Sequence, residues 1–550
     1  MTNRPSEVAG ESVRPARSLR KLWLSLAIML VVAMAFAGYR LLRQPPVLDV
    51  GKGIDIDLAA PDFLLNTREL SRLPKDIAAT PLLSGLVDEQ LVFHYEEDEA
   101  RLSVEGAIRR LAYEHKLDLS DRFLATLLAA PAEIGVWRGG KGRPEHFVAV
   151  IERGVLGKLS ETLARIVAND QQIKLAGTLK TIGGAIPIYA LDYGGGRRLA
   201  FAGKGDRWVV LSDPALALND EGEIAGKDAD LLLDLLHGKH VWFEQLTPSP
   251  TADHSIVIGA QALTLDYSAF FPTLTALRFD HDGKAWHIAA QLRAAEENAA
   301  GKPDFTALWR FLPGNAALCA ALPVNWLAAQ TPLQALTDND AAVPSLLAAL
   351  DPVAAVCWYP ETRLSAPLFV AHATRPLPAE TGTLLEKIAA RVWKGDDGQV
   401  QKAEVDHGLR LSSVIASAHG SQRNGDGQRQ FEATLAQHGN LFFFSPDRRA
   451  VDAALAVAGK RAPALGDAPG FANGALLMYD PARLGQLLRT DIQEVLPQDE
   501  EAYFRGIARS ALWPRLDAWG RQHPAALLVP SQSTDKGFVS LDYKALKAAN

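Results

Sequence analysis

Two glycine-rich stretches contain residue types that can bind phosphate. Gly194–Arg198 has the sequence GGGRR, and Gly203–Gly205 has the sequence GKG. A phosphate-binding loop needs the spacing G-x-x-x-x-G-K-[ST] between a strand and a helix. Both stretches lie between predicted strands instead, where glycine supplies the positive φ of a turn. We therefore interpret both as turns and expect no bound cofactor.

A serine and a lysine near the C-terminus have the spacing of a known catalytic pair. Ser533 and Lys536 fit S-x-x-K, which in penicillin-recognising hydrolases begins a helix. Here Asp535–Gly537 predicts a hairpin turn before a strand at Phe538–Leu541, and no SDN or KTG sequence accompanies it. We interpret the match as chance. No G-x-S-x-G elbow is present either, so the sequence leaves the catalytic residues unknown.

Metal ligation requires histidine, cysteine or carboxylate groups at defined spacing. The thirteen histidines are scattered, and no H-E-x-x-H, C-x-x-C or EF-hand sequence occurs. His237 and His240 flank Gly238, which predicts a glycine-capped helix end rather than a ligand pair. The acidic run Glu96–Glu99 predicts a solvated turn. The sequence therefore predicts no metal site.

Both cysteines lie in apolar stretches that have the character of strands. Cys319 follows NAAL, and Cys357 follows PVAAV. Two interpretations stay open: a pair of small buried hydrophobic side chains, or a disulfide if the two strands are neighbours. A catalytic thiol is disfavoured, because neither cysteine has the electropositive setting that stabilises a thiolate.

Ala418–Gln430 is a long polar segment, AHGSQRNGDGQRQ. It is longer than the corresponding segment near Gly194. On a sheet protein such a segment is either a binding loop or an unconstrained insertion.

An apolar run near the N-terminus predicts a membrane anchor. Leu22–Tyr39 contains no charged residue and is long enough to cross a bilayer as a helix. The flanking basic residues Arg14, Arg17, Arg20 and Lys21 outnumber Arg40 and Arg43 after the run, which places the N-terminus in the cytoplasm. We expect a cytoplasmic tail (1–21), a signal-anchor helix in the bacterial inner membrane (22–42) and a linker (43–59), with the bulk of the chain periplasmic. Two alternatives are a cleaved signal peptide, ending near Ala35–Ala37, and a buried core helix.

Composition predicts a folded protein of more than one domain. The chain has 550 residues, of which 48% are hydrophobic and 22% charged. Residues 1–43 hold seven basic residues and two acids, so the net charge of −7 leaves −12 for the remainder. This acidic balance argues against nucleic acid and against docking flat on anionic lipid.

The chain also predicts an internal duplication, because five segments recur in the same order. The matched pairs are Leu127–Trp137 with Leu346–Trp358, His146–Arg153 with Leu368–Arg375, Leu159–Asp170 with Leu384–Asp396, QQIK with GQVQ, and Gly205–Asp213 with Gly439–Asp447. We therefore expect two repeats, 60–300 and 301–550. The predicted fold class is α+β, with a mainly antiparallel sheet and helices on one face in each repeat.

Three stretches carry a resemblance to a known family: Leu73–Leu102, the segment IRRLAYEH at Ile108–His115, and GDRWVVLSDP at Gly205–Pro214. They resemble a family of uncharacterised bacterial envelope proteins that has one N-terminal anchor and is classed as a domain of unknown function. The resemblance implies a role beside a bacterial alpha-2-macroglobulin-like protein, which is sometimes encoded next to such proteins. It supplies no catalytic residue to transfer.

The function that we expect is that of a membrane-anchored periplasmic scaffold or partner-binding protein, with no enzymatic activity. The alternative is a periplasmic hydrolase whose site lies in the cleft between the two repeats, since such clefts are favoured places for binding sites.

Overall fold

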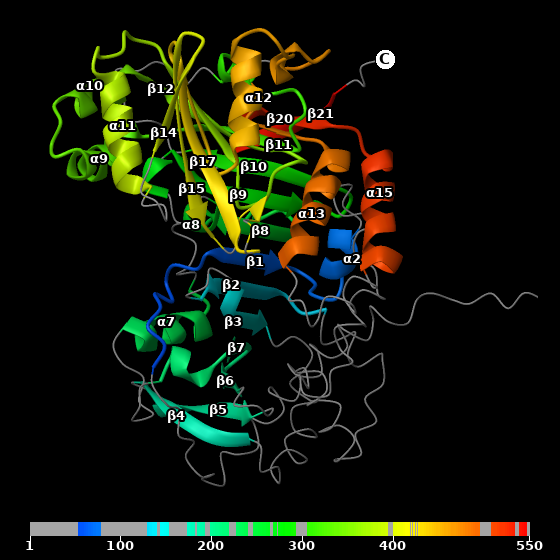
Figure 1. The fold of residues 1–550 in the computed structure, drawn as a ribbon. Helices are drawn as coiled ribbons and strands as arrows, with labels where there is room; N and C mark the ends of the chain where they lie inside the picture. Colours follow the sequence, from blue (N-terminus) through cyan, green and yellow to red (C-terminus); the bar gives the residue numbers. More distant parts are fainter. Residues whose placement is uncertain are drawn as a thin grey trace, which may run out of the picture. The chain divides into compact units, whose positions relative to one another are not determined.

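The computed structural model describes only part of the chain, as strands, helices and the turns between them (Figure 1). The described residues are 53–78, 129–139, 144–152, 173–181, 184–192, 198–218, 227–239, 246–263, 268–271, 273–292, 305–393, 400–417, 420, 422–423, 425, 427–472, 474–495, 508–533 and 538–546. The chain divides into two compact units. Unit 1 comprises Met1–Asp76 and Val87–Phe243, and unit 2 comprises Ile77–Leu86 and Glu244–Asn550.

Unit 1 contains one antiparallel series of strands in the order β1-β2-β3-β7-β6-β5-β4. Its buried side chains include Tyr189, Phe201 and Trp208. Helix α7 packs on β7. The elements are β1 (Phe63–Thr67), β2 (Ala132–Arg138), β3 (Pro144–Glu152), β4 (Ile173–Thr181), β5 (Gly184–Asp192), β6 (Arg198–Lys204), β7 (Arg207–Leu211), the 3₁₀ turn η4 (Pro214–Leu216) and α7 (Lys227–Leu236). Helix α2 (Leu73–Ala78) contains the division between the units.

Unit 2 continues the antiparallel pattern in the order β8-β9-β10-β21-β20-β19-β11-β12-β13-β18-β17-β15-β14, and β16 pairs with one end of β17. The strands are β8 (His254–Gly259), β9 (Leu274–His281), β10 (Trp286–Leu292), β11 (Leu318–Pro323), β12 (Leu350–Trp358), β13 (Leu368–Ala373), β14 (Gln401–Val405), β15 (Gly408–Ala416), β16 (Gln422–Arg423), β17 (Arg429–His438), β18 (Leu441–Ser445), β19 (Leu477–Tyr479), β20 (Ala526–Ser533) and β21 (Phe538–Ala545).

The described helices of unit 2 are mostly short. They are α8 (Ala260–Leu263), η6 (Ser268–Phe270), η7 (Leu308–Phe311), η8 (Trp326–Ala329), α9 (Gln330–Leu336), α10 (Ala342–Ala349), α11 (Thr381–Val392), α12 (Arg448–Ala458), η9 (Leu465–Asp467), α13 (Pro481–Val495), the π-turn η10 (Ala508–Leu512) and α15 (Trp513–Gln522). Figure 1 shows α11 and α12 on opposite sides of the strands β12, β15 and β17.

A tight turn joins β9 to β10 at Asp282-Gly283, a dipeptide that predicts an antiparallel hairpin between two strands. Gly283 has a φ of 88°, which a side chain would strain. The Asp282 carboxylate accepts hydrogen bonds from the backbone N–H groups of Lys284 and Ala285, both at 2.9 Å. The predicted antiparallel hairpin is therefore confirmed.

The main core of unit 2 is built around a disulfide. Cys319 on β11 and Cys357 on β12 lie directly opposite each other and form a disulfide bond. Both cysteines are fully buried, together with Trp309, whose indole N–H donates to the carbonyl of Ala475 at 3.1 Å. Of the two interpretations that the sequence left open, the structure contains the disulfide.

The order of strands in unit 1 recurs in unit 2. Strands β11-β12-β13-β18-β17-β15-β14 pair as β1-β2-β3-β7-β6-β5-β4 do. An aspartate follows the matching strands β7 and β18 and caps the next turn or helix: Asp213 accepts from Ala215 N–H, and Asp447 from Arg449 N–H. The predicted duplication requires the strand orders of the two units to agree in this way. The duplication itself stays a prediction. Strands β8–β10 belong to unit 2, and the repeat boundaries 60–300 and 301–550 stay a prediction.

The predicted fold class is wrong in two respects. The described residues form mainly antiparallel sheet with few helices, rather than α+β domains behind an N-terminal membrane helix. The prediction failed because it gave helical stretches equal weight with hairpin strands. Among the described residues, no helix is long and apolar enough to cross a membrane. Residues 22–42 lie outside the described residues, and the structure does not support the predicted single-pass location in the inner membrane.

Replacing both cysteines, Cys319→Ala with Cys357→Ala, is expected to lower the free energy of unfolding by about 2–4 kcal/mol, because the disulfide restricts the unfolded chain. Denaturant unfolding of the wild type and the double variant, each with and without reductant, measures the effect. Reductant should destabilise only the wild type. Equal stability of the two oxidised proteins would show that this bond contributes nothing.

Candidate functional site

The sequence motifs that suggested chemistry lie in turns and strand ends. Gly203 belongs to β6, and Gly205, with a φ of 63°, turns the chain from β6 into β7. Of the other glycine-rich stretch, residues 194–197 lie outside the described residues and Arg198 begins β6. Ser533 is the last residue of β20, so the S-x-x-K serine ends a strand and begins no helix. Lys536 is outside the described residues, as is the acidic run Glu96–Glu99.

The predicted helix cap at Gly238 is present. His237 N–H donates to the carbonyl of Leu233, and Gly238 follows with a φ of 78°. Nε2 of His237 lies 2.9 Å from the ammonium group of Lys204. A protonated amine at this nitrogen competes with a metal ion for the same lone pair. His240 lies outside the described residues.

The polar segment Ala418–Gln430 folds back onto the sheet where it is described. Gln422 and Arg423 form β16 and pair with Gln430 and Arg429 of β17. The carbonyl of Gly420 accepts hydrogen bonds from the guanidinium groups of Arg429 at 3.2 Å and Arg363 at 3.4 Å. These contacts tie the segment to its own strand, so its described residues resemble an extended hairpin more than a free binding loop.

Groups with shifted pKa values can mark a catalytic site when they converge. Here each shift has a separate structural cause. The Lys387 ammonium and the Ala342 N–H hold the pKa of Asp340 below its usual range. The Glu432 carboxylate raises the pKa of Arg448. Burial, followed by the nearby Glu361 charge, raises the pKa of Tyr359 well above its usual value.

The strands at the centre of unit 2 are apolar on both faces. One face carries Cys319, Ala355, Val370 and Phe443, which are at most 2% exposed. Helix α12 completes this face, since its residues Val451 and Leu455 belong to the same cluster. Strands with apolar residues on both faces need a covering layer on each side.

The opposite face is only partly covered. Directly paired residues place Ala320, Val356, Phe369, Phe444 and Leu435 in one row across five strands. Helix α11 packs over the Leu435 and Phe444 end of the row. Phe369, near the middle, is 43% exposed. An apolar sheet face that exposes an aromatic ring is typical of a binding surface.

We name this surface the Phe369 patch: Val356, Trp358, Leu364, Phe369 and Phe444. The rings of Phe369 and Phe444 are stacked, with centroids 5.9 Å apart. The Trp358 indole N–H donates to the Leu364 carbonyl at 2.9 Å, and Leu364 itself is 41% exposed. The other three side chains are half-buried.

The turn that presents Leu364 is held in place. Arg363, which is 3% exposed, donates from Nε to a carboxylate oxygen of Asp491 on α13 at 3.0 Å. The same carboxylate accepts from the Leu364 N–H at 3.4 Å. Thr362 closes the turn through hydrogen bonds with the backbone of Tyr359 at 3.0 and 3.3 Å. The patch is therefore preorganised, which lowers the entropy cost of binding.

No residue of this patch was singled out as a site from the sequence. The apolar runs of β12 and β18 indicate strands in the sequence, but which face stays exposed depends on where α11 and α12 pack. The sequence does contain a signal that this strand is apolar on both faces. Leu441–Phe444 is apolar at every position, whereas a strand with one solvent-facing side would alternate between apolar and polar residues.

A protein-family model described as "Uncharacterized protein conserved in bacteria (DUF2138)" matches residues 21–543. A curated relative from Escherichia coli (strain K12), "Uncharacterized protein YfaA", is 30% identical over 516 residues, which cover 90% of this chain and 91% of that protein.

A solved structure described as "Structure of crystal form III of TP0453" is 13% identical and has a TM-score of 0.22. The match covers 44% of this chain and 83% of that one. Because the TM-score is so low, this likeness carries no argument about fold or function.

Replacing the buried phenol, Tyr359→Phe, is expected to raise the free energy of unfolding by about 1 kcal/mol at neutral pH. The Tyr359 hydroxyl has no hydrogen-bond partner in the described part of the chain, and burying such a group is costly. In the wild type the raised pKa of Tyr359 keeps the phenol neutral when folded, whereas the unfolded chain loses the proton near pH 10. Stability should therefore fall as pH rises above about 10, and less so in the variant.

Denaturant unfolding at pH 7 and pH 10.5 measures both effects. The matched control is Tyr479→Phe, because Tyr479 has a hydrogen bond with Tyr543 to lose. If Tyr359→Phe destabilises the protein at pH 7 as much as the control does, the Tyr359 hydroxyl does not impose the expected cost of burial.

Proposed function

Because the chain belongs to this family of uncharacterised bacterial proteins, whose description names no activity, we propose that it is a non-catalytic, partner-binding scaffold protein. The observation that carries the proposal is the Phe369 patch, an apolar sheet face that α11 covers only at one end. The scattered causes of the shifted pKa values also favour binding over catalysis.

The chemistry of the patch suits a protein partner with apolar side chains of its own. Aromatic rings at the centre of a surface, with polar residues at its edge, are typical of protein interfaces. Glu361 and Ser365 lie at the exposed edge, beside Leu364. The charge of −12 beyond residue 43 disfavours nucleic acid and anionic lipid as ligands.

The partner that we propose is a bacterial alpha-2-macroglobulin-like protein. This choice follows from the family resemblance of the sequence, while the surface comes from the structure. In the proposal, the partner's apolar side chains cover Phe369 and Leu364, and the stacked Phe444 stays in place beneath them.

Phe369→Asp is expected to weaken binding of the purified alpha-2-macroglobulin-like protein from the same bacterium at least tenfold, because a charge would be buried in the interface. Val414→Asp is the matched control. Val414 is 42% exposed, nearly the same as Phe369, and its cross-strand partners place it on the opposite face of the sheet. Titration of the immobilised protein with the partner gives the affinities.

The folded state of both variants is checked by circular dichroism and by their unfolding midpoints. Binding that is lost in Phe369→Asp and kept in Val414→Asp supports the proposal. Binding that survives both changes, or is lost equally in both, rejects this surface. A wild-type protein that does not bind rejects the partner.

A further inference from the structure

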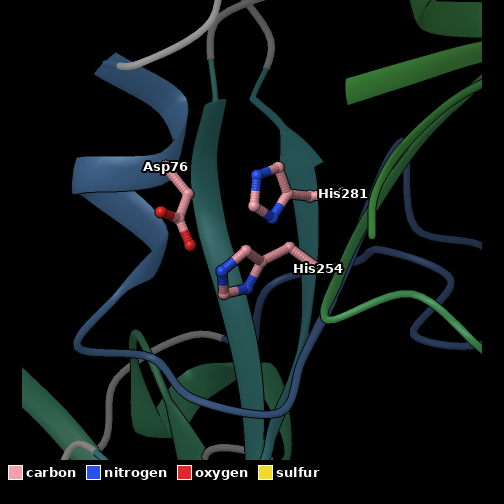
Figure 2. Close-up of side chains that lie close together, drawn as sticks. All are labelled: Asp76, His254 and His281. Atoms are coloured by element: carbon pink, nitrogen blue, oxygen red, sulfur yellow. The ribbon is translucent and has the colours of Figure 1, made fainter. Parts of the chain in front are cut away.

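Two histidines that are 27 positions apart in the sequence meet at one end of the sheet in unit 2. His254 begins β8 and His281 ends β9, and the two are directly opposite each other. Their rings are stacked, with centroids 5.6 Å apart, and the side chains are 1% and 5% exposed. Figure 2 shows the two imidazoles side by side. Asp76, which Figure 2 also labels, belongs to unit 1.

Trp286 extends the row. It begins β10 opposite His281, and its ring centroid lies 5.1 Å from that of His281 and 6.3 Å from that of His254. The row alternates with a polar row on the other face, where Ser255 donates to the Asp280 carboxylate at 2.7 Å. Arg278 donates to the same carboxylate at 2.8 Å. The two imidazoles therefore lie on the opposite face of the sheet from this ion pair.

We propose that His254 and His281 form a binding site for a divalent transition metal that prefers imidazole, namely zinc, copper or nickel. One nitrogen from each ring lies within 4.8 Å of the other. Two nitrogens bound to one tetrahedral zinc ion are about 3.4 Å apart, since each Zn–N bond is about 2.0–2.1 Å. Small rotations of the two rings close this gap. The site is independent of the Phe369 patch.

The local charge favours a cation at this position. Asp253 and Asp282 are the sequence neighbours of His254 and His281, and both lie at the same end of the strands. Asp253 is half-buried, and its backbone N–H donates to the His281 carbonyl at 2.7 Å. Two acidic residues at this end of the strands add negative charge near a bound divalent ion. We do not expect magnesium or calcium to bind here, because these ions prefer oxygen ligands.

One hydrogen bond of His281 is expected to break when a metal ion binds. The Gly283 N–H donates to Nδ1 of His281 at 3.3 Å, a long bond. A metal on Nδ1 takes the lone pair that accepts this bond. A metal on Nε2 leaves the proton of the neutral ring on Nδ1, so that Nδ1 no longer accepts. Either mode of binding therefore breaks the bond from Gly283, which a purely structural histidine pair would keep.

The test uses the full chain after treatment with a chelator, titrated separately with Zn²⁺, Cu²⁺, Ni²⁺ and Mg²⁺. We expect one-to-one binding of the first three and none of Mg²⁺. His254→Gln and His281→Gln should each weaken Zn²⁺ binding at least tenfold. The Cu²⁺ complex of the wild type should show nitrogen hyperfine structure in its electron paramagnetic resonance spectrum, and the amide signal of Gly283 should shift when Zn²⁺ is added.

Two control variants separate this site from surface chelation. His287→Gln removes an exposed histidine on β10 that pairs with Asp282 at 3.0 Å. His407→Asn removes one ring of the His407–His438 pair, whose centroids are 5.9 Å apart. Asparagine tolerates the φ of 56° at position 407. Zinc binding that survives both controls supports the proposal.

Three outcomes overturn the proposal: no binding by the wild type, binding unchanged in His254→Gln and His281→Gln, or binding lost only in the controls. Circular dichroism and metal-free unfolding midpoints show whether each variant folds. If one glutamine variant does not fold, the hyperfine structure and the Gly283 shift of the wild type decide the question.

Discussion

The central strands of unit 2 are apolar on both faces, and the other features of this unit follow from that constraint. A one-sided sheet needs a single covering layer, whereas β11, β12, β13 and β18 need two. The first face is completed within the chain by α12 and by the buried disulfide between Cys319 and Cys357. The second face has α11 over one end and leaves Phe369 exposed. The chain thus leaves open a surface that another apolar surface can cover.

The local features that the sequence predicted correctly are those that depend on a few neighbouring residues. The hairpin at Asp282-Gly283 follows from a glycine that can adopt a positive φ and an aspartate that can cap the turn. The cap at Gly238 follows from the same property of glycine. The two cysteines were placed in strands, but their pairing depended on whether β11 and β12 are adjacent, which spacing alone does not decide.

The features that could not be predicted from the sequence depend on register and on packing between distant segments. His254 and His281 became neighbours only because β8 and β9 align so that the first residue of one strand faces the last residue of the other. No spacing rule for metal ligands covers two residues from different strands of a hairpin with a long connection. The fold class was wrong for a related reason. Helical and extended stretches were both recognised, but the extent of antiparallel pairing across unit 2 is a property of the whole chain.

The central claim concerns Phe369, namely that this ring contacts solvent in the free protein and a partner in the complex. Hydroxyl-radical footprinting, read residue by residue by mass spectrometry, measures this directly. We expect both Phe369 and Val414 to be oxidised in the free protein, and only Phe369 to be protected once the alpha-2-macroglobulin-like protein is bound. A Phe369 that resists oxidation in the free protein, or one that is oxidised equally in the complex, would contradict this claim.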